Sequence, residues 1–148
     1  MKDYPFELTF SALRDACIAR APTFRNAKGE LSNSDWTPSD KIVSIVGELG
    51  ECANIIKKVR RGDFELEDRP AEFKGCTVRE AIAKELADTV TYIDHLAAKY
   101  DIDLGQAVFE KFNEISRRVG SPIMMVGPSA IDDNCSVVQV IDGSVEPE

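Results

Sequence analysis

Apolar residues recur every three or four positions between Thr37 and Gly62, and this spacing is typical of an amphipathic helix. Thr37 is a suitable N-cap, with Pro38 at the first helical position and Asp40 placed to complete a reciprocal cap. Basic residues cluster before Gly62, where they interact favourably with the negative end of the helix dipole. The apolar stripe comprises Ile42, Ile45, Val46, Leu49, Ala53 and Ile56. We therefore expect one long helix that ends at Gly62.

The same reasoning predicts three further helices. The first has Thr9 as its cap and stops before Pro22, another opens with a capping box at Thr77, and the last runs from Asp103 to Gly120. Their apolar stripes are Phe6, Phe10, Leu13 and Cys17; Val78, Ile82, Leu86, Thr89, Ile93 and Leu96; and Leu104, Val108, Phe112 and Ile115. We expect the stripe that follows Thr77 to be buried.

The end of the chain has a different character. Pro122–Val126 and Ser136–Val140 are short and apolar or β-branched, which favours a small hairpin or an extended tail. A chain of 148 residues has the length of one domain. We predict an all-α protein, with a four-helix-type bundle over residues 1–120 and a short irregular or β-hairpin tail over residues 121–148.

Net charge and cysteine usage restrict the class of protein. A formal charge of −8 argues against a nucleic-acid polymer as partner, because phosphate backbones bind cationic surfaces. The four cysteines form no compact framework, and the single histidine, His95, argues against a zinc cluster. No apolar run has the length of a signal core or a membrane span. We expect a cytoplasmic protein that has no membrane partner.

Two pairs of carboxylates carry the strongest functional signal. Glu48 and Glu51 are three residues apart within one predicted helix, and Glu85 and Asp88 are three apart within the next. Residues at this spacing lie on one helix face, so each pair can direct two carboxylates at one point. Carboxylate oxygens are ligands for Mg²⁺, or for Mn²⁺, and protein-bound Mg²⁺ usually also contacts a substrate phosphate. The alternative is a solvated face with ion pairs to lysine and arginine.

An internal repeat surrounds the two pairs. Glu48 and Glu85 lie about 80–90° from the centres of their apolar stripes, and Glu51 and Asp88 lie about 60° further round. The two acid pairs therefore have the same angular position relative to their stripes. An apolar or aromatic residue lies between the acids of each pair, which indicates a cleft or a subunit contact. A shift of 37 residues places Ile45, Glu48, Leu49, Glu51, Ile55 and Ile56 on Ile82, Glu85, Leu86, Asp88, Tyr92 and Ile93.

At these residues the chain resembles the MazG-like all-α nucleoside triphosphate pyrophosphohydrolases, in which an ExxE helix precedes an ExxD helix. The matching segments are Gly47–Lys58 with Arg60–Gly62, Glu85–Asp88 with Tyr92, and Lys111–Asn113. The resemblance implies hydrolysis of a nucleoside triphosphate to the monophosphate and pyrophosphate, in house-cleaning or nucleotide-pool control. It implies that Mg²⁺ is held by catalytic carboxylates of Glu48, Glu51, Glu85 and Asp88. It also implies a homodimer or a dimer-based tetramer.

Five residues are candidates for contact with the substrate. Lys111 and Arg118 lie on one flank of the fourth predicted helix, and Lys58 lies two turns after the first acid pair, so all three can reach phosphate oxygens or simply be solvated. Asn113 is suggested by the resemblance. Trp36 precedes the first acid-bearing helix and either stacks on a base or packs as a hydrophobic staple at the helix start.

Two alternatives remain open. One is a narrower enzyme of the same fold, such as a dUTP or dCTP hydrolase or a phosphoribosyl-ATP hydrolase. The other is a non-catalytic helical protein that binds nucleotide or metal and acts through partners.

Overall fold

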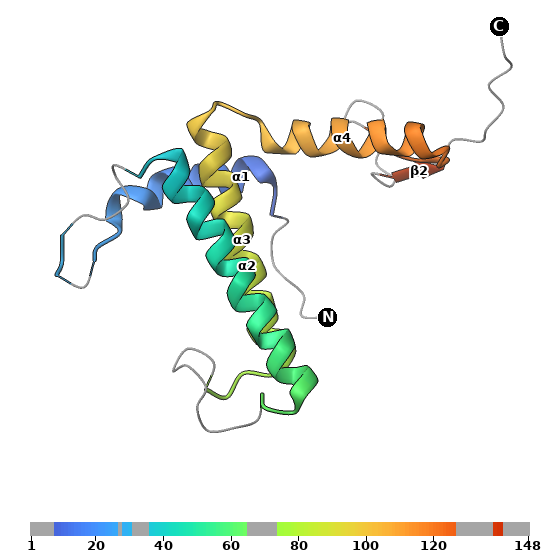
Figure 1. The fold of residues 1–148 in the computed structure, drawn as a ribbon. Helices are drawn as coiled ribbons and strands as arrows, with labels where there is room; N and C mark the ends of the chain where they lie inside the picture. The colour runs from blue at the N-terminus through green and yellow to red at the C-terminus, as the bar shows by residue number, and fades with distance from the viewer. Residues whose placement is uncertain (1–7, 27, 31–35, 65–73, 127–137, 141–148) are drawn as a thin grey trace, which may run out of the picture. The chain divides into compact units, whose positions relative to one another are not determined.

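The computed structural model describes residues 8–26, 28–30, 36–64, 74–126 and 138–140 (Figure 1). Contacts group the chain into two compact units, Met1–Ile102 and Asp103–Glu148, and each unit is described by itself. The first contains α1 (Phe10–Arg20), the short helix η1 (Ala21–Thr23), α2 (Pro38–Arg61) and α3 (Val78–Lys99). The second contains α4 (Leu104–Val119), β1 (Ile123–Met125) and β2 (Val138–Val140). The prediction of an all-α fold with a short β tail is confirmed.

The helix starts follow the predicted caps. Thr37 and Asp40 form a reciprocal capping box at α2, and Thr77 and Glu80 form another at α3. The Thr9 hydroxyl accepts a hydrogen bond from the Ala12 amide at 3.1 Å and so caps α1. Local side-chain chemistry thus fixes where each of these helices begins.

Glycine ends two of the helices. Gly62 after α2 and Gly120 after α4 both have left-handed backbone conformations, with φ of 77° and 68°. A left-handed residue directs its amide back to the last turn, and glycine adopts this conformation without steric cost. The two predicted helix ends are therefore confirmed.

The central feature of the first unit is the antiparallel pair of α2 and α3, which lie side by side in Figure 1. Near one end of the pair, Trp36 packs against Tyr92. At the other end, the loop residue Phe64 is buried with Ile55 and Ala81, and Val78 and Ile82 pack against them. We call this group the loop-end core.

An ion pair between the partly buried Arg14 and the buried Asp94 attaches α1 to α3. The Arg14 Nε atom lies 3.0 and 3.1 Å from the two carboxylate oxygens of Asp94, and Nη2 lies 2.9 Å from Oδ1. Arg14 also donates to the carbonyl of Ile102 at 3.0 Å. Asp94 has no exposed surface. The charge of this carboxylate is therefore compensated within the first unit.

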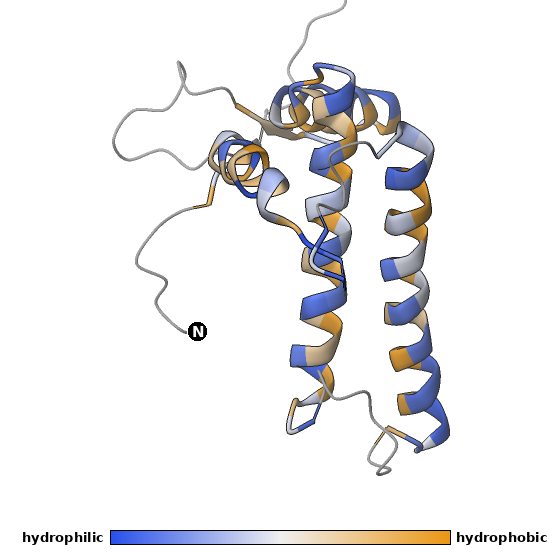
Figure 2. Cartoon of the chain, turned by 90° about the vertical axis from the view of Figure 1, so that its left-hand side faces the viewer, coloured by the Kyte–Doolittle hydropathy of each residue, from blue (hydrophilic) through white to orange (hydrophobic). Residues whose placement is uncertain are grey.

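One prediction about burial was wrong. Thr89 is buried as expected, whereas Leu86 of the same stripe is 47% exposed. Most of the predicted α2 stripe is also exposed, because α2 directs a neighbouring row towards α3, with Lys41 and Cys52 among its buried members. Orange, hydrophobic segments recur along both helices in Figure 2. The described helices include none that is long and apolar enough to cross a membrane.

In the second unit, the amide of Asn113 fastens β1 to α4. Its Nδ2 donates to the Met125 carbonyl at 2.9 Å, and its Oδ1 accepts from the Met125 amide at 2.8 Å. β1 pairs with β2 in antiparallel register, with Ile123 opposite Val140 and Met125 opposite Val138. A two-stranded antiparallel sheet therefore follows α4 in the sequence.

Candidate metal centre

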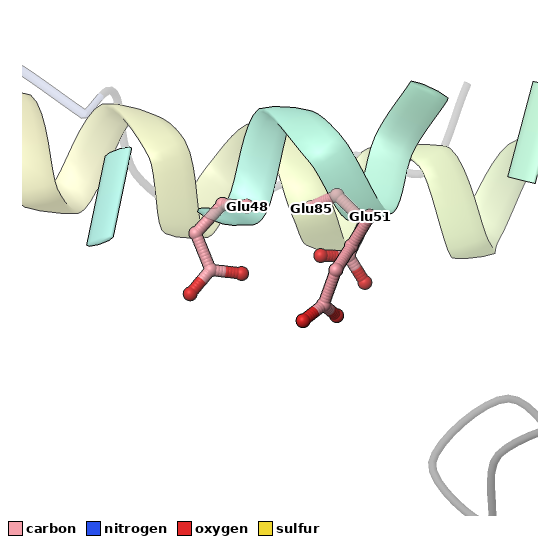
Figure 3. Close-up of side chains that lie close together, drawn as sticks. All are labelled: Glu48, Glu51 and Glu85. Carbon is pink, nitrogen blue, oxygen red and sulfur yellow. The ribbon is translucent and has the colours of Figure 1, made fainter. Parts of the chain in front are cut away.

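Three carboxylates converge at the middle of the α2–α3 pair. One side-chain oxygen from each of Glu48, Glu51 and Glu85 lies within 4.8 Å of the others. Figure 3 shows the three side chains directed to the same side, two from α2 and one from α3. Glu85 is buried, Glu48 is half-buried and Glu51 is exposed. The cluster therefore reaches from the helix interface to the surface.

The ionisation of the cluster reflects its crowding. Burial, the charge of Glu51 and a hydrogen bond with Glu48 together raise the pKa of Glu85 to about 7. Burial also raises the pKa of Glu48, and the charges of Asp88 and Glu51 add to that effect. Adjacent like charges disfavour ionisation, so the cluster tends to retain a proton when nothing compensates its charge.

Asp88 lies at the edge of this group. The three residues within 4.8 Å of one another do not include it, yet it is the charged neighbour that raises the pKa of Glu48 most. Glu51 has the corresponding effect on Glu85. The charges therefore act across the helix pair, with Asp88 of α3 acting on Glu48 of α2 and Glu51 of α2 acting on Glu85 of α3.

The donor set fits a hard divalent cation. Carboxylate oxygens are the preferred protein ligands of Mg²⁺ and Mn²⁺, and the cluster offers three within a small radius. A cation at this place would offset the repulsion that raises the pKa values of Glu48 and Glu85.

An aromatic and cationic group lies beside the acids. The rings of Trp36 and Tyr92 are stacked, with centroids 6.1 Å apart and planes 14° from parallel, and His95 lies 6.3 Å from Tyr92. The ammonium of Lys41 lies 4.6 Å from the Trp36 ring centroid. We call these four residues the aromatic–cationic cluster. Burial raises the pKa of Tyr92, and the charges of Glu48 and Asp88 add to it, which places this ring near the acids.

The candidate substrate contacts have different surroundings. Lys58 is exposed and lies two turns along α2 from Glu51. In the second unit, Lys111 is paired with Glu114 at 2.6 Å, and Arg118 is exposed in the last turn of α4. The buried amide of Asn113 is engaged by Met125. The structure therefore places only Lys58 and Trp36 in the same unit as the acids.

Sequence reasoning did not identify Lys41 as part of the site. Lys41 precedes Glu48 by seven residues, which is two helical turns, so both lie on the same side of α2. That spacing could have indicated Lys41 as a residue of the site. A lysine at the start of a helix is nevertheless usually solvated, and its burial depends on how Trp36 and Tyr92 pack.

Comparison of the sequence with models of known protein families, and with curated proteins, finds no match. The function has to be inferred from the side chains and their arrangement.

Proposed function

We propose that this chain is a divalent-metal-dependent hydrolase that cleaves a nucleoside triphosphate to the monophosphate and pyrophosphate. The observation that carries the proposal is the convergence of Glu48, Glu51 and Glu85 from two helices, with Glu85 buried among like charges. A surface that served only for solubility would keep such acids apart and hydrated. The proposal agrees with the resemblance to the MazG-like pyrophosphohydrolases.

Glu48, Glu51, Glu85 and Asp88 would hold Mg²⁺ or Mn²⁺. Such an ion supplies charge that offsets the phosphates and lowers the pKa of the attacking water. A carboxylate of this group that is not fully engaged by the metal would accept the proton of that water. The water oxygen then bonds to the α-phosphorus, the bond from that phosphorus to the bridging oxygen breaks, and pyrophosphate leaves.

A planar base also has a candidate contact beside the acids. Trp36 is half-buried and already stacks on Tyr92, and stacking of a base on an aromatic side chain contributes about 1–3 kcal/mol in single-strand binders. Because every base has a flat face, this contact favours nucleotides as a class. A broad substrate range and the narrower dUTP, dCTP or phosphoribosyl-ATP activities are all consistent with it.

The test is incubation of the purified chain with Mg²⁺ and a panel of canonical, deoxy and modified nucleotides, with pyrophosphate and orthophosphate measured separately. We expect pyrophosphate release, and Glu51→Gln should lower it by about 100-fold or more, since even outer-shell changes at metal sites cost 10–100-fold. The matched control is Glu110→Gln, which removes an exposed acid of α4. Nucleotide binding without turnover of any substrate would instead identify a non-catalytic binding protein.

We also propose that a second copy of the chain covers the apolar flank of the α2–α3 pair. This flank consists of Ile42, Val46, Leu49 and Ile56 on α2 with Leu86 and Val90 on α3, and their exposed fractions lie between 42% and 62%. Glu51 lies two positions after Leu49, which places it about 160° away around the helix. The apolar flank therefore lies away from Glu51, and a partner bound there leaves that carboxylate accessible.

The size and spacing of the flank support a second copy. It is about 20 Å long and two helices wide, about 400 Å² in projection, which is as large as the biggest apolar patch of a typical monomer. Ile42 and Ile56 are equally spaced from Leu49, so two antiparallel copies of α2 place Ile42 opposite Ile56 and Leu49 opposite itself. Two such helix pairs form a bundle of four.

Sedimentation of the full chain tests this assembly. We expect a dimer or a larger even assembly for the wild type and dissociation for Val46→Glu, because a charge at the centre of the contact is desolvated without a partner. Ile18→Glu changes an exposed apolar residue of α1 and should leave the assembly intact. A monomeric wild type would contradict the proposed assembly.

A further inference from the structure

Lys41 is a buried cation in the first unit. Its exposed fraction is 3%, and it lies on the row of α2 that faces α3. The ammonium is 4.6 Å from the Trp36 ring centroid and 6.0 Å from that of Tyr92. Lysine is almost never this buried unless its charge is compensated. The ring faces supply part of that compensation, because their electron density attracts a cation.

No carboxylate of the described residues forms an ion pair closer than 4.0 Å with Lys41. Burial lowers the pKa of Lys41, and the neighbouring charge of Lys99 lowers it further, while Asp40 opposes the effect.

Other positive charge gathers at this end of the helix pair. Arg20 acts on Tyr92 and on His95, and Lys41 itself lowers the pKa of His95 after burial has done so. The acid that acts on His95, Asp94, is already paired with Arg14. Glu48 and Asp88 act on Tyr92 from the metal centre. The α2–α3 pair thus has a negative middle and, about 10 Å along the helix axis, a cationic end lined with rings.

We propose that the aromatic–cationic cluster is an anion-binding site in which Lys41 takes a phosphate group. An ammonium binds phosphate as a point charge with up to three N–H donors, and the partly apolar surroundings strengthen each contact. An anion at this place would neutralise the buried cation, which is otherwise costly to desolvate. The inference stands apart from the hydrolysis proposed above, because it requires a phosphate and no turnover.

The only tryptophan of the chain reports on this site directly. Trp36 is the single tryptophan in the sequence, and its ring is in contact range of the Lys41 ammonium. We would titrate the metal-free protein with inorganic pyrophosphate and with inorganic phosphate, follow Trp36 fluorescence, and hold ionic strength constant with chloride. We expect a saturable change for pyrophosphate. It should occur at lower concentration once Mg²⁺ is present, because the cation offsets repulsion from Glu48 and Asp88.

Variants separate this site from general electrostatics. Lys41→Met keeps the length and the apolar stem, and should weaken pyrophosphate binding by at least about tenfold, whereas Lys41→Arg should retain the saturable response. Lys57→Met removes an exposed lysine of the same helix and should leave the binding curve unchanged. Circular dichroism of each variant identifies any that does not fold, and calorimetric titration of the wild type tests binding without any substitution.

The outcomes are distinct from those of the hydrolysis proposal. In the metal-free titration, Glu51→Gln should still give a saturable response to pyrophosphate, although this variant should lose turnover. The anion site is overturned if the wild type gives no saturable signal by fluorescence or calorimetry. It is also overturned if folded Lys41→Met binds pyrophosphate as tightly as the wild type, which would leave an adventitious ion only.

Discussion

Asp94 and Glu85 are both buried carboxylates of α3, nine residues apart, with exposed fractions of 0% and 4%. Asp94 receives hydrogen bonds from Arg14 on both of its oxygens. Glu85 has Glu48 and Glu51 as its neighbours, and their charges raise its pKa. The same helix therefore contains one buried acid whose charge is compensated within the chain and another whose surroundings increase the cost of ionisation.

This difference separates a structural role from a functional one. A fold gains nothing from placing acids together, since every ionised pair opposes folding. The position of Glu85 is understandable if something outside the chain supplies positive charge, whereas Asp94 requires nothing further. Three experiments test this contrast, and the largest effect is expected at Asp94.

Asp94→Ala should lower the free energy of unfolding by about 3–5 kcal/mol, because it removes the carboxylate that compensates the partly buried Arg14 guanidinium. Urea denaturation of the two proteins measures the loss. Asp15→Ala removes an exposed aspartate of α1 and should change stability by less than about 0.5 kcal/mol. Equal stabilities for the two variants would mean that the ion pair contributes nothing to the fold.

Mg²⁺ should stabilise the wild-type chain. A ligand that binds only the folded state adds about 2.7 kcal/mol when its concentration is 100 times the dissociation constant. Thermal melts at increasing Mg²⁺ should show a rising Tm for the wild type and for Glu110→Gln, and a much smaller rise for Glu51→Gln. A Tm that does not respond to millimolar Mg²⁺ or Mn²⁺ would argue against a metal at the cluster.

The smallest effect concerns pH in the absence of metal. The pKa of Glu85 is about 7 in the folded chain against an ordinary value of 4.5, so the folded state binds this proton more tightly than the unfolded state. The resulting stabilisation is fully present below about pH 4.5 and is lost as the pH rises through about 7.

Glu85→Gln cannot titrate, so its stability should fall less than that of the wild type between about pH 5 and about pH 8. Glu48, whose pKa is also raised, would account for part of the dependence that remains. Urea denaturation of both proteins across this range makes the comparison. Parallel pH profiles for the two proteins would show that Glu85 ionises normally in the folded chain.

The predictable parts of the fold are those that depend on short stretches of sequence. Thr37 with Asp40, and Thr77 with Glu80, could be assigned as caps because the interacting groups are three residues apart. Gly62 was predictable as a helix end for the same reason. The matching positions of Glu48 and Glu85 around their helices were predictable from periodicity, whereas their approach depended on which rows of α2 and α3 meet.

Features that depend on packing between distant segments were not predictable. Phe64 lies in a charged loop and gives no periodic signal, yet it is buried in the loop-end core. The Arg14–Asp94 pair joins residues that are 80 positions apart. The exposure of Leu86 depends on which of two adjacent rows a helix presents to its neighbour, and an apolar stripe alone does not decide this.

The loop-end core has a consequence for the register of the two long helices. The cluster of Ile55, Phe64 and Ala81 holds one end of the α2–α3 pair, and the stacked rings of Trp36 and Tyr92 hold the other. The acids lie between these two fixed points. A slip of one residue would move one helix by about 1.5 Å along the other and would separate carboxylates that now share a single site. The contacts at the two ends of the helix pair therefore fix the register that brings the carboxylates together.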